Sequence, residues 1–174
     1  MDNFVKYAIE NGGDIFPLII PSHLTNGTGT FNPSVFNDNG QIYVNVRHCQ
    51  VTLTHSERNK FPNQWGQLIY LHPENDKTLT TTNFVLKLNN DLSVANVSKV
   101  DMSKFDVAPI WDFRGLEDAR FIKWEGEYYL VGVRRDTTTN GEGRMEYSKI
   151  DISDPDNVKE ISRVRMETPE PGSV

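Results

Sequence analysis

The stretch from Phe31 to Arg47 reads FNPSVFNDNGQIYVNVR, and it decides the fold class. Two runs of apolar, β-branched and aromatic residues flank the turn sequence Asn37-Asp38-Asn39-Gly40. Asn and Gly both tolerate the positive φ angles of a tight turn, so Asn-Gly between apolar runs is the strongest short signal for a β-hairpin. The stretch therefore predicts two antiparallel strands, 31–36 and 41–47.

The second half of the chain follows the same order, with a strand pattern, a tight turn at Gly126 and a second strand pattern. Overlaying Gly40 on Gly126 gives an offset of 126 − 40 = 86 residues. This offset places Asn32 on Asp118. Both halves are thus expected to begin a strand at a polar residue and to turn at the same distance from it.

Each half contains apolar runs for four strands. The first half adds 84–88 and 97–102 to its hairpin, and the second half comprises 118–124, 128–135, 145–151 and 161–166. A four-stranded antiparallel meander that recurs along a chain is typical of β-propeller blades. We therefore expect an all-β fold in which 1–174 forms one partial β-propeller unit. Its expected parts are a first blade over 16–102, a second blade over 103–168 and a linker-like tail over 169–174.

Two blades do not make a closed propeller, because roughly four to eight blades are needed to cover the sheet edges. We expect this chain to be the N-terminal part of a longer propeller, or one of several copies that associate as a homo-oligomer.

Three other segments have weaker patterns. Residues 1–14 predict a short helix that ends at two glycines. The apolar run 16–20 predicts a further strand, although it contains Pro17. The long polar region 48–83 is either an insertion or a strand pair with extended loops.

The composition excludes several classes of protein. The chain has 24 acidic and 18 basic residues, a net charge of −6, so we expect no nucleic-acid partner. We expect a cytoplasmic protein without a membrane span, because no leader pattern and no long apolar run is present. The single cysteine, Cys49, is expected to be a half-buried thiol. The four His residues share no ligand spacing, so we expect no metal.

The block Gly115-Leu116-Glu117-Asp118-Ala119-Arg120 is the most charged strand entry in the chain. Charge at the mouth of an inner strand is costly unless something binds there, which indicates a functional site. The alternative is a structural salt bridge between Glu117 and Arg120 at a blade junction.

Three motifs together carry a family resemblance. Phe31-Asn32-Pro33-Ser34, Tyr43-Val44-Asn45-Val46-Arg47 and the Gly115–Arg120 block resemble the five-bladed propeller enzymes of glycoside hydrolase family 130, which are mannoside phosphorylases and mannosidases. The resemblance covers roughly 16–166 and implies the first two of five blades. Ala119 stands where proline is usual in that family.

The resemblance implies roles for several residues. Asp118 is similar to the family's proton donor, and Asn32 and Arg47 to the residues that hold the sugar beside the scissile bond. At the mouth of an inner strand, a carboxyl group is expected to be desolvated and partly protonated near neutral pH. Glu117 and Arg120 are expected to form an ion pair that orients the acid. Trp111 is a candidate platform for a sugar face, or alternatively a core or rim aromatic.

We therefore expect a carbohydrate-active enzyme, or part of one, that cleaves β-mannosides or related glycosides by phosphorolysis or hydrolysis. No cofactor is expected; inorganic phosphate would be a co-substrate in a phosphorylase. The family's phosphate-binding cations are expected in later blades, so this chain alone is expected to be inactive. The alternatives are a non-catalytic sugar-binding or assembly module on the same scaffold, and a pentoside-active five-bladed glycosidase.

Overall fold

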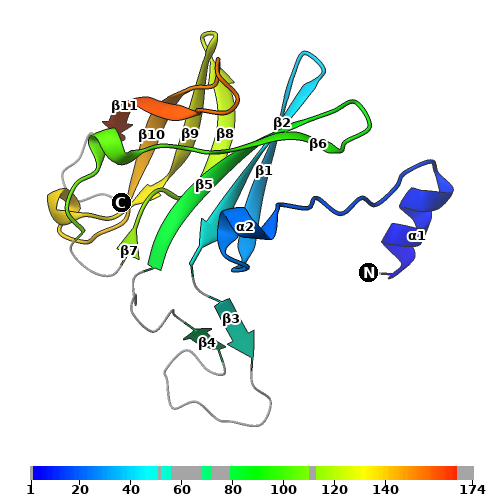
Figure 1. Cartoon of the computed structure of the whole chain (residues 1–174), viewed down its shortest axis with the longest axis horizontal. Helices are drawn as coiled ribbons and strands as arrows, with labels where there is room; N and C mark the ends of the chain where they lie inside the picture. Colours follow the sequence, from blue (N-terminus) through cyan, green and yellow to red (C-terminus); the bar gives the residue numbers. More distant parts are fainter. Residues whose placement is uncertain (1, 51, 56–67, 72–78, 110–112, 168–174) are drawn as a thin grey trace.

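The computed structural model describes residues 2–50, 52–55, 68–71, 79–109 and 113–167. Two antiparallel four-stranded meanders pack against each other, and this arrangement confirms the predicted all-β fold with partial blades (Figure 1). In the part of the chain that the structure describes, no helix is long and apolar enough to cross a membrane.

Each sheet follows the chain in simple order. The first sheet has the order β1-β2-β5-β6, with strands Thr30–Asp38, Gln41–Cys49, Leu79–Leu88 and Val94–Lys99. A short strand β7, Phe113–Arg114, joins this sheet by pairing parallel to the start of β5. The second sheet has the order β11-β10-β9-β8, with strands Lys159–Arg165, Arg144–Asp151, Glu127–Arg134 and Glu117–Trp124.

The two halves repeat each other in backbone geometry as well as in order. The turn residues Asn39 and Gly40 have φ angles of 51° and 96°, and the same pattern returns in the turn between β8 and β9. We call β1 and β8, the first strand of each sheet, the inner strands. Near the start of each inner strand the pairing register shifts, and the residue inside the shift has a positive φ: 51° at Asn32 and 52° at Asp118. The offset of 86 residues is therefore a structural repeat, with a β-bulge and a hairpin at equivalent positions.

The core lies between the two sheets. Phe121 on β8 is 2% exposed, and its ring centroid lies 5.5 Å from that of Phe36 and 5.6 Å from that of Tyr43 on the first sheet. Leu116, Leu130 and other apolar residues complete this cluster. Burying a Phe side chain stabilises a fold by about 1.5–3 kcal/mol, so these rings are a main source of the sheet–sheet attachment.

The N-terminal segment departs in part from expectation. The predicted helix is present as α1, Asp2–Glu10, which stands away from the sheets (Figure 1). The prediction of a strand over 16–20 is wrong, because this segment pairs with no strand. Pro17 has no N–H to donate to a sheet, and Pro21 begins a short helix α2, Ser22–Thr25. From this run Ile20 packs against the apolar cluster of the first sheet that includes Leu86.

The long region between β2 and β5 is an insertion that contains a two-stranded sheet of its own, so it combines the two expected alternatives. Strand β3, Thr52–His55, pairs antiparallel with β4, Leu68–Leu71. Just before it, Cys49 is fully buried rather than half-buried, and its Sγ lies 3.4 Å from the hydroxyl of Thr81.

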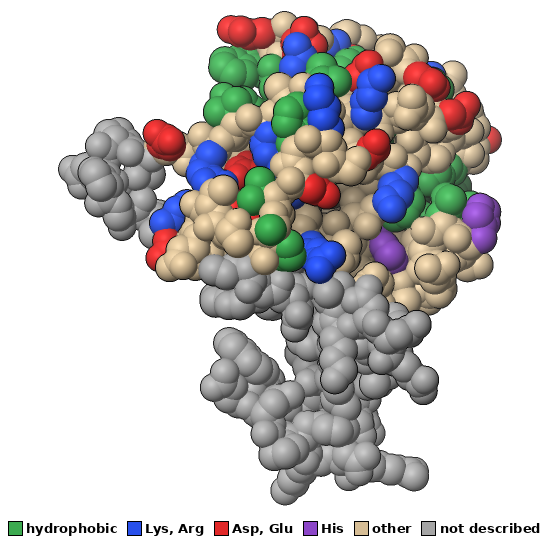
Figure 2. Space-filling view, turned by 60° about the vertical axis from the view of Figure 1, so that its left-hand side comes forward, with side chains coloured by type: hydrophobic (Ala, Val, Ile, Leu, Met, Phe, Trp, Pro, Cys, Tyr) green, Lys and Arg blue, Asp and Glu red, His purple; other side chains and the backbone are tan. Residues whose placement is uncertain are grey.

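The second sheet has an open apolar face on the side opposite the core. Cross-strand pairs and ring contacts join Ile122 to Tyr129 and Tyr129 to Tyr147. Trp124, which is 59% exposed, packs beside Tyr129. Figure 2, turned toward the side where Figure 1 draws this sheet, shows hydrophobic side chains at the surface among Lys and Arg side chains. An apolar aromatic face of this kind is typical of a surface that packs against another element.

We expect the purified chain to self-associate through this face. The double substitution Ile122→Ser and Trp124→Ser should shift the sedimentation distribution toward the monomer, because it removes apolar surface without touching the core. Val35→Ser, at an exposed site on the first sheet, serves as the control and should leave the distribution unchanged. A wild-type chain that sediments as a monomer over a wide concentration range would contradict this expectation.

The core packing can be measured on a single strand. Phe121→Ala should lower the free energy of unfolding by about 3–5 kcal/mol in urea titrations, because it leaves a cavity between the sheets. Ile122→Ala is the matched control on the opposite face of the same strand, where the side chain is 38% exposed, and it should cost less than about 1 kcal/mol. Equal losses for the two variants would show that the interface is not tightly packed.

Candidate functional site

Three of the sequence-predicted residues converge where the two inner strands begin. The amide of Asn32 on β1 donates to Asp118 Oδ1 over 2.5 Å, and Arg47 Nη1 on β2 donates to the same oxygen over 2.6 Å. Among the described residues, Asp118 Oδ2 has no hydrogen-bond donor, and the side chain is 51% exposed. One carboxylate oxygen is thus held by the protein, while the other accepts no hydrogen bond from the described residues, so the half-exposed side chain can still meet a ligand.

The β-bulges place these groups. Asn32 and Asp118 both have φ near 50°, a conformation in which Asn and Asp are enriched among non-glycine residues. A bulge bends its strand and redirects the side chain of the extra residue. Because β1 and β8 carry equivalent bulges, the amide and the carboxylate meet across the junction of the two sheets.

Arg47 is held in one orientation by four groups. Besides Asp118, its Nη2 contacts Glu117 Oε2 at 3.3 Å, its Nε donates to Thr81 Oγ1 over 3.1 Å, and its guanidinium lies 5.0 Å from the ring centre of Phe31. A guanidinium with this many partners loses little further freedom when it binds a ligand. Arg47 therefore presents a preorganised positive charge beside Asp118.

Glu117 is bound differently from the prediction. Its Oε1 accepts from Arg135 Nη1 over 3.0 Å and its Oε2 meets Arg47, so both oxygens are engaged by arginines other than Arg120. The expected ion pair between Glu117 and Arg120 is wrong, because Arg120 reaches across to β1 and donates to the carbonyl of Pro33 over 3.1 Å. Arg120 thus ties the two inner strands together near Asp118.

The charge state of Asp118 also differs from the expectation. Burial raises the pKa of this carboxyl, but the hydrogen bonds from Asn32 and Arg47, with the charges of Arg47 and Arg120, lower it below its ordinary value overall. For Arg47 the signs are reversed. Burial lowers the pKa of its guanidinium, but the hydrogen bond to Asp118 and the neighbouring negative charges raise this pKa above its ordinary value overall. At neutral pH the unliganded site is a carboxylate beside a guanidinium, so the expected partial protonation of Asp118 is wrong for this state.

Arg135 and Thr81 belong to this site but were not predicted from the sequence. Hairpin pairing sets Glu117 opposite Val133, so the end of β9 was the signal that could have identified Arg135. Thr81 carries no local signal, since only the pairing of β2 with β5 brings it beside Arg47. Trp111 lies outside the described residues.

Comparisons of the chain with protein-family models, with curated proteins and with solved structures give no match in any of the three. Within the described ranges, no group of three or more His, Cys, Asp or Glu side chains is arranged to hold a metal ion. The geometry around Asp118 is therefore what indicates a function.

The low pKa of Asp118 can be tested by NMR titration of its carboxyl carbon, which should give a value below about 3.9. Arg47→Gln should raise this pKa, because it removes both a hydrogen bond and a positive charge. Arg120→Gln is the milder comparison and should raise the pKa less, since Arg120 acts on Asp118 through its charge alone.

The same shift predicts a stability effect. A pKa that is lower in the folded than in the unfolded chain stabilises the fold above the unfolded value, and this contribution is lost as the pH falls through the folded pKa. In acid, the unfolding free energy of wild type should fall more steeply than that of Asp118→Asn. Parallel pH profiles would contradict the depressed pKa.

Proposed function

We propose that this chain is part of a carbohydrate-active enzyme that cleaves β-mannosides or related glycosides, with Asp118 as the general acid. The single observation that carries this proposal is the half-exposed carboxylate of Asp118, whose Oδ1 accepts hydrogen bonds from Asn32 and Arg47 while Oδ2 accepts none from the described residues. Side chains that gather on one carboxylate at the mouth of two inner strands suit a ligand rich in hydroxyl groups.

Proton donation requires that the pKa of Asp118 rise when substrate binds. A sugar whose hydroxyls accept hydrogen bonds from Asn32 and Arg47 draws these donors away from Oδ1 and excludes water. The two hydrogen bonds that lower the pKa then weaken, whereas desolvation, the largest single influence on this group, increases. Substrate binding thus raises the pKa of Asp118 and favours its protonated form, the form that a general acid needs.

In the reaction, the proton on Asp118 moves to the glycosidic oxygen, directly or through a sugar hydroxyl. The bond from that oxygen to the anomeric carbon breaks as water or inorganic phosphate attacks the same carbon. The protonated leaving group departs as an alcohol or a shortened sugar, and the glycosyl group becomes a free sugar in hydrolysis, where the attacking water also loses a proton, or a sugar phosphate in phosphorolysis. A group that positions this nucleophile must face Asp118 across the sugar. We propose that a further sheet, packed on the open face of the second sheet, supplies it.

Turnover of β-mannosides by the complete protein tests the assignment. Asp118→Asn should lower the rate about 10²–10⁴-fold, the usual contribution of a general acid, while the variant still unfolds cooperatively, at a somewhat lower temperature because the ion pair with Arg47 is lost. Asp91→Asn, in an exposed loop, is the control and should keep full activity. Unchanged turnover in Asp118→Asn would overturn the role of Asp118, and a requirement for phosphate would distinguish phosphorolysis from hydrolysis.

A non-catalytic sugar-binding module is the second candidate, and the ionised state of Asp118 favours it, because a carboxylate that holds no proton cannot act as a general acid. This candidate predicts that mannosides bind without product at any phosphate concentration and that Asp118→Asn leaves binding intact. A panel that includes pentosides in the same assay also covers the third candidate, a pentoside-active glycosidase.

A further inference from the structure

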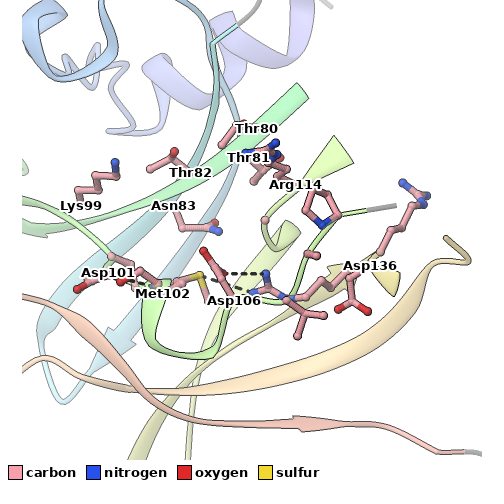
Figure 3. A pocket seen from close by; sticks show the side chains of 18 residues that line it. Thr80, Thr81, Thr82, Asn83, Lys99, Asp101, Met102, Asp106, Arg114 and Asp136 are labelled. Atoms are coloured by element: carbon pink, nitrogen blue, oxygen red, sulfur yellow. Dashed lines mark hydrogen bonds and ion pairs between the residues drawn. The ribbon is translucent and has the colours of Figure 1, made fainter. Parts of the chain in front are cut away.

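A separate cavity of about 480 Å³ opens between the two sheets, beside the Asp118 site (Figure 3). This volume is within the range of small-molecule sites. One wall is 80–83 at the start of β5, and the others are the connection 99–109, Arg114 with Gly115, and 134–136 at the end of β9. The residues that line it are mainly hydroxyl-bearing, amide or charged, and the described part of the lining contains no aromatic ring.

Every acid in this lining is already engaged by the protein. Asp101 accepts two hydrogen bonds from Ser103, from its backbone N–H at 3.0 Å and its hydroxyl at 2.6 Å. Asp106 lies 3.7 Å from Arg163 and 3.9 Å from Arg134. Asp136 caps the 3-10 helix that follows it and lies 3.7 Å from Arg165.

The cations of the lining are less completely matched. Arg134 pairs with buried Glu146 at 2.9 Å, and Arg135 pairs with Glu117 at 3.0 Å. Across the described residues, Lys99 and Arg114 form no ion pair, although the charge of Lys99 is close enough to help lower the pKa of Asp101. The charges left for a ligand are therefore positive.

The backbone fixes Arg114 in the cavity wall. Strand β7 pairs Arg114 with Thr80, and Gly115 follows with a φ of 93°. A Cβ at Gly115 would lie 2.2 Å from the carbonyl oxygen of Thr81, so only glycine permits this close approach to β5. Figure 3 shows Arg114 and Lys99 on different sides of the row formed by Thr80, Thr82 and Asn83.

We propose that this cavity binds a sugar unit that carries an oxyanion, a carboxylate or a phosphate. Arg114 would meet the anion, Lys99 would add a second positive charge on the other side of the row, and the hydroxyl of Ser103 would meet a sugar hydroxyl. The cavity adjoins the Asp118 site through two contacts, Arg47 with Thr81 and Arg135 with Glu117. On the proposed function, it is a specificity subsite that selects acidic oligosaccharides.

Binding to the full chain tests the proposal independently of turnover. Calorimetric titrations with glucuronic acid, mannose 6-phosphate, mannose and inorganic phosphate should show the two acidic sugars binding at least tenfold more tightly than either of the others. The double substitution Lys99→Gln and Arg114→Gln should weaken the acidic sugars at least tenfold. Raising the ionic strength should weaken them as well. Lys87→Gln, on the same strand as Thr80 but at its other end, is the control.

The outcomes separate this site from the Asp118 site. Asp118→Asn should keep acidic-sugar binding in the cavity whatever it does to turnover, so failure of one assignment leaves the other measurable. Mannose binding as tightly as the acidic sugars would overturn the oxyanion preference. Inorganic phosphate binding as tightly as mannose 6-phosphate would overturn the sugar and indicate a free-phosphate site. Binding that Lys99→Gln with Arg114→Gln leaves unchanged would overturn the location.

Discussion

The structure depends on how the outer edge of β8 is satisfied. As the edge strand of the second sheet, β8 has backbone groups with no neighbouring strand to bond, and such groups are costly when buried. Side chains of the first sheet supply the partners: Ser34 Oγ accepts from the N–H of Phe121 over 3.0 Å, and Asn45 donates to the carbonyl of Ala119 over 3.0 Å. Asn83 donates to the carbonyl of Leu116 over 2.9 Å. These bonds fix the position of β8 along the first sheet, including its alignment with β1.

The position of the site follows from that constraint. Hydrogen bonds between the two sheets are directional, so they allow only one alignment of the sheets. The aromatic packing around Phe121 would still allow small shifts along the strand direction. With the register set, the bulges of β1 and β8 face each other and bring Asn32 to Asp118. The cavity lined by Lys99 and Arg114 opens at the same junction and adjoins the Asp118 site. Both polar sites therefore belong to the seam between the sheets.

Local chemistry explains which parts could be predicted from the sequence. The hairpins depend on turn residues a few positions apart, and the offset of 86 residues correctly related Asn32 to Asp118. The partners of Glu117 could not be derived in this way, since Arg47 and Arg135 reach it through tertiary packing. The ionised state of Asp118 likewise results from neighbours on other strands. A short apolar run such as 16–20 gave a false strand, because periodicity alone does not distinguish a strand from a covering segment.

The paired bulges give the site an approximate internal symmetry. Asn32 and Asp118 occupy equivalent backbone positions with nearly equal φ angles, and their side chains differ only in an amide nitrogen against a carboxylate oxygen. One side chain is thus a hydrogen-bond donor and the other an acceptor because of this single atom, while the backbone of the two bulges is the same. A repeat that began with two identical residues could become an acid and its helper through one isosteric replacement, with no rearrangement of the main chain.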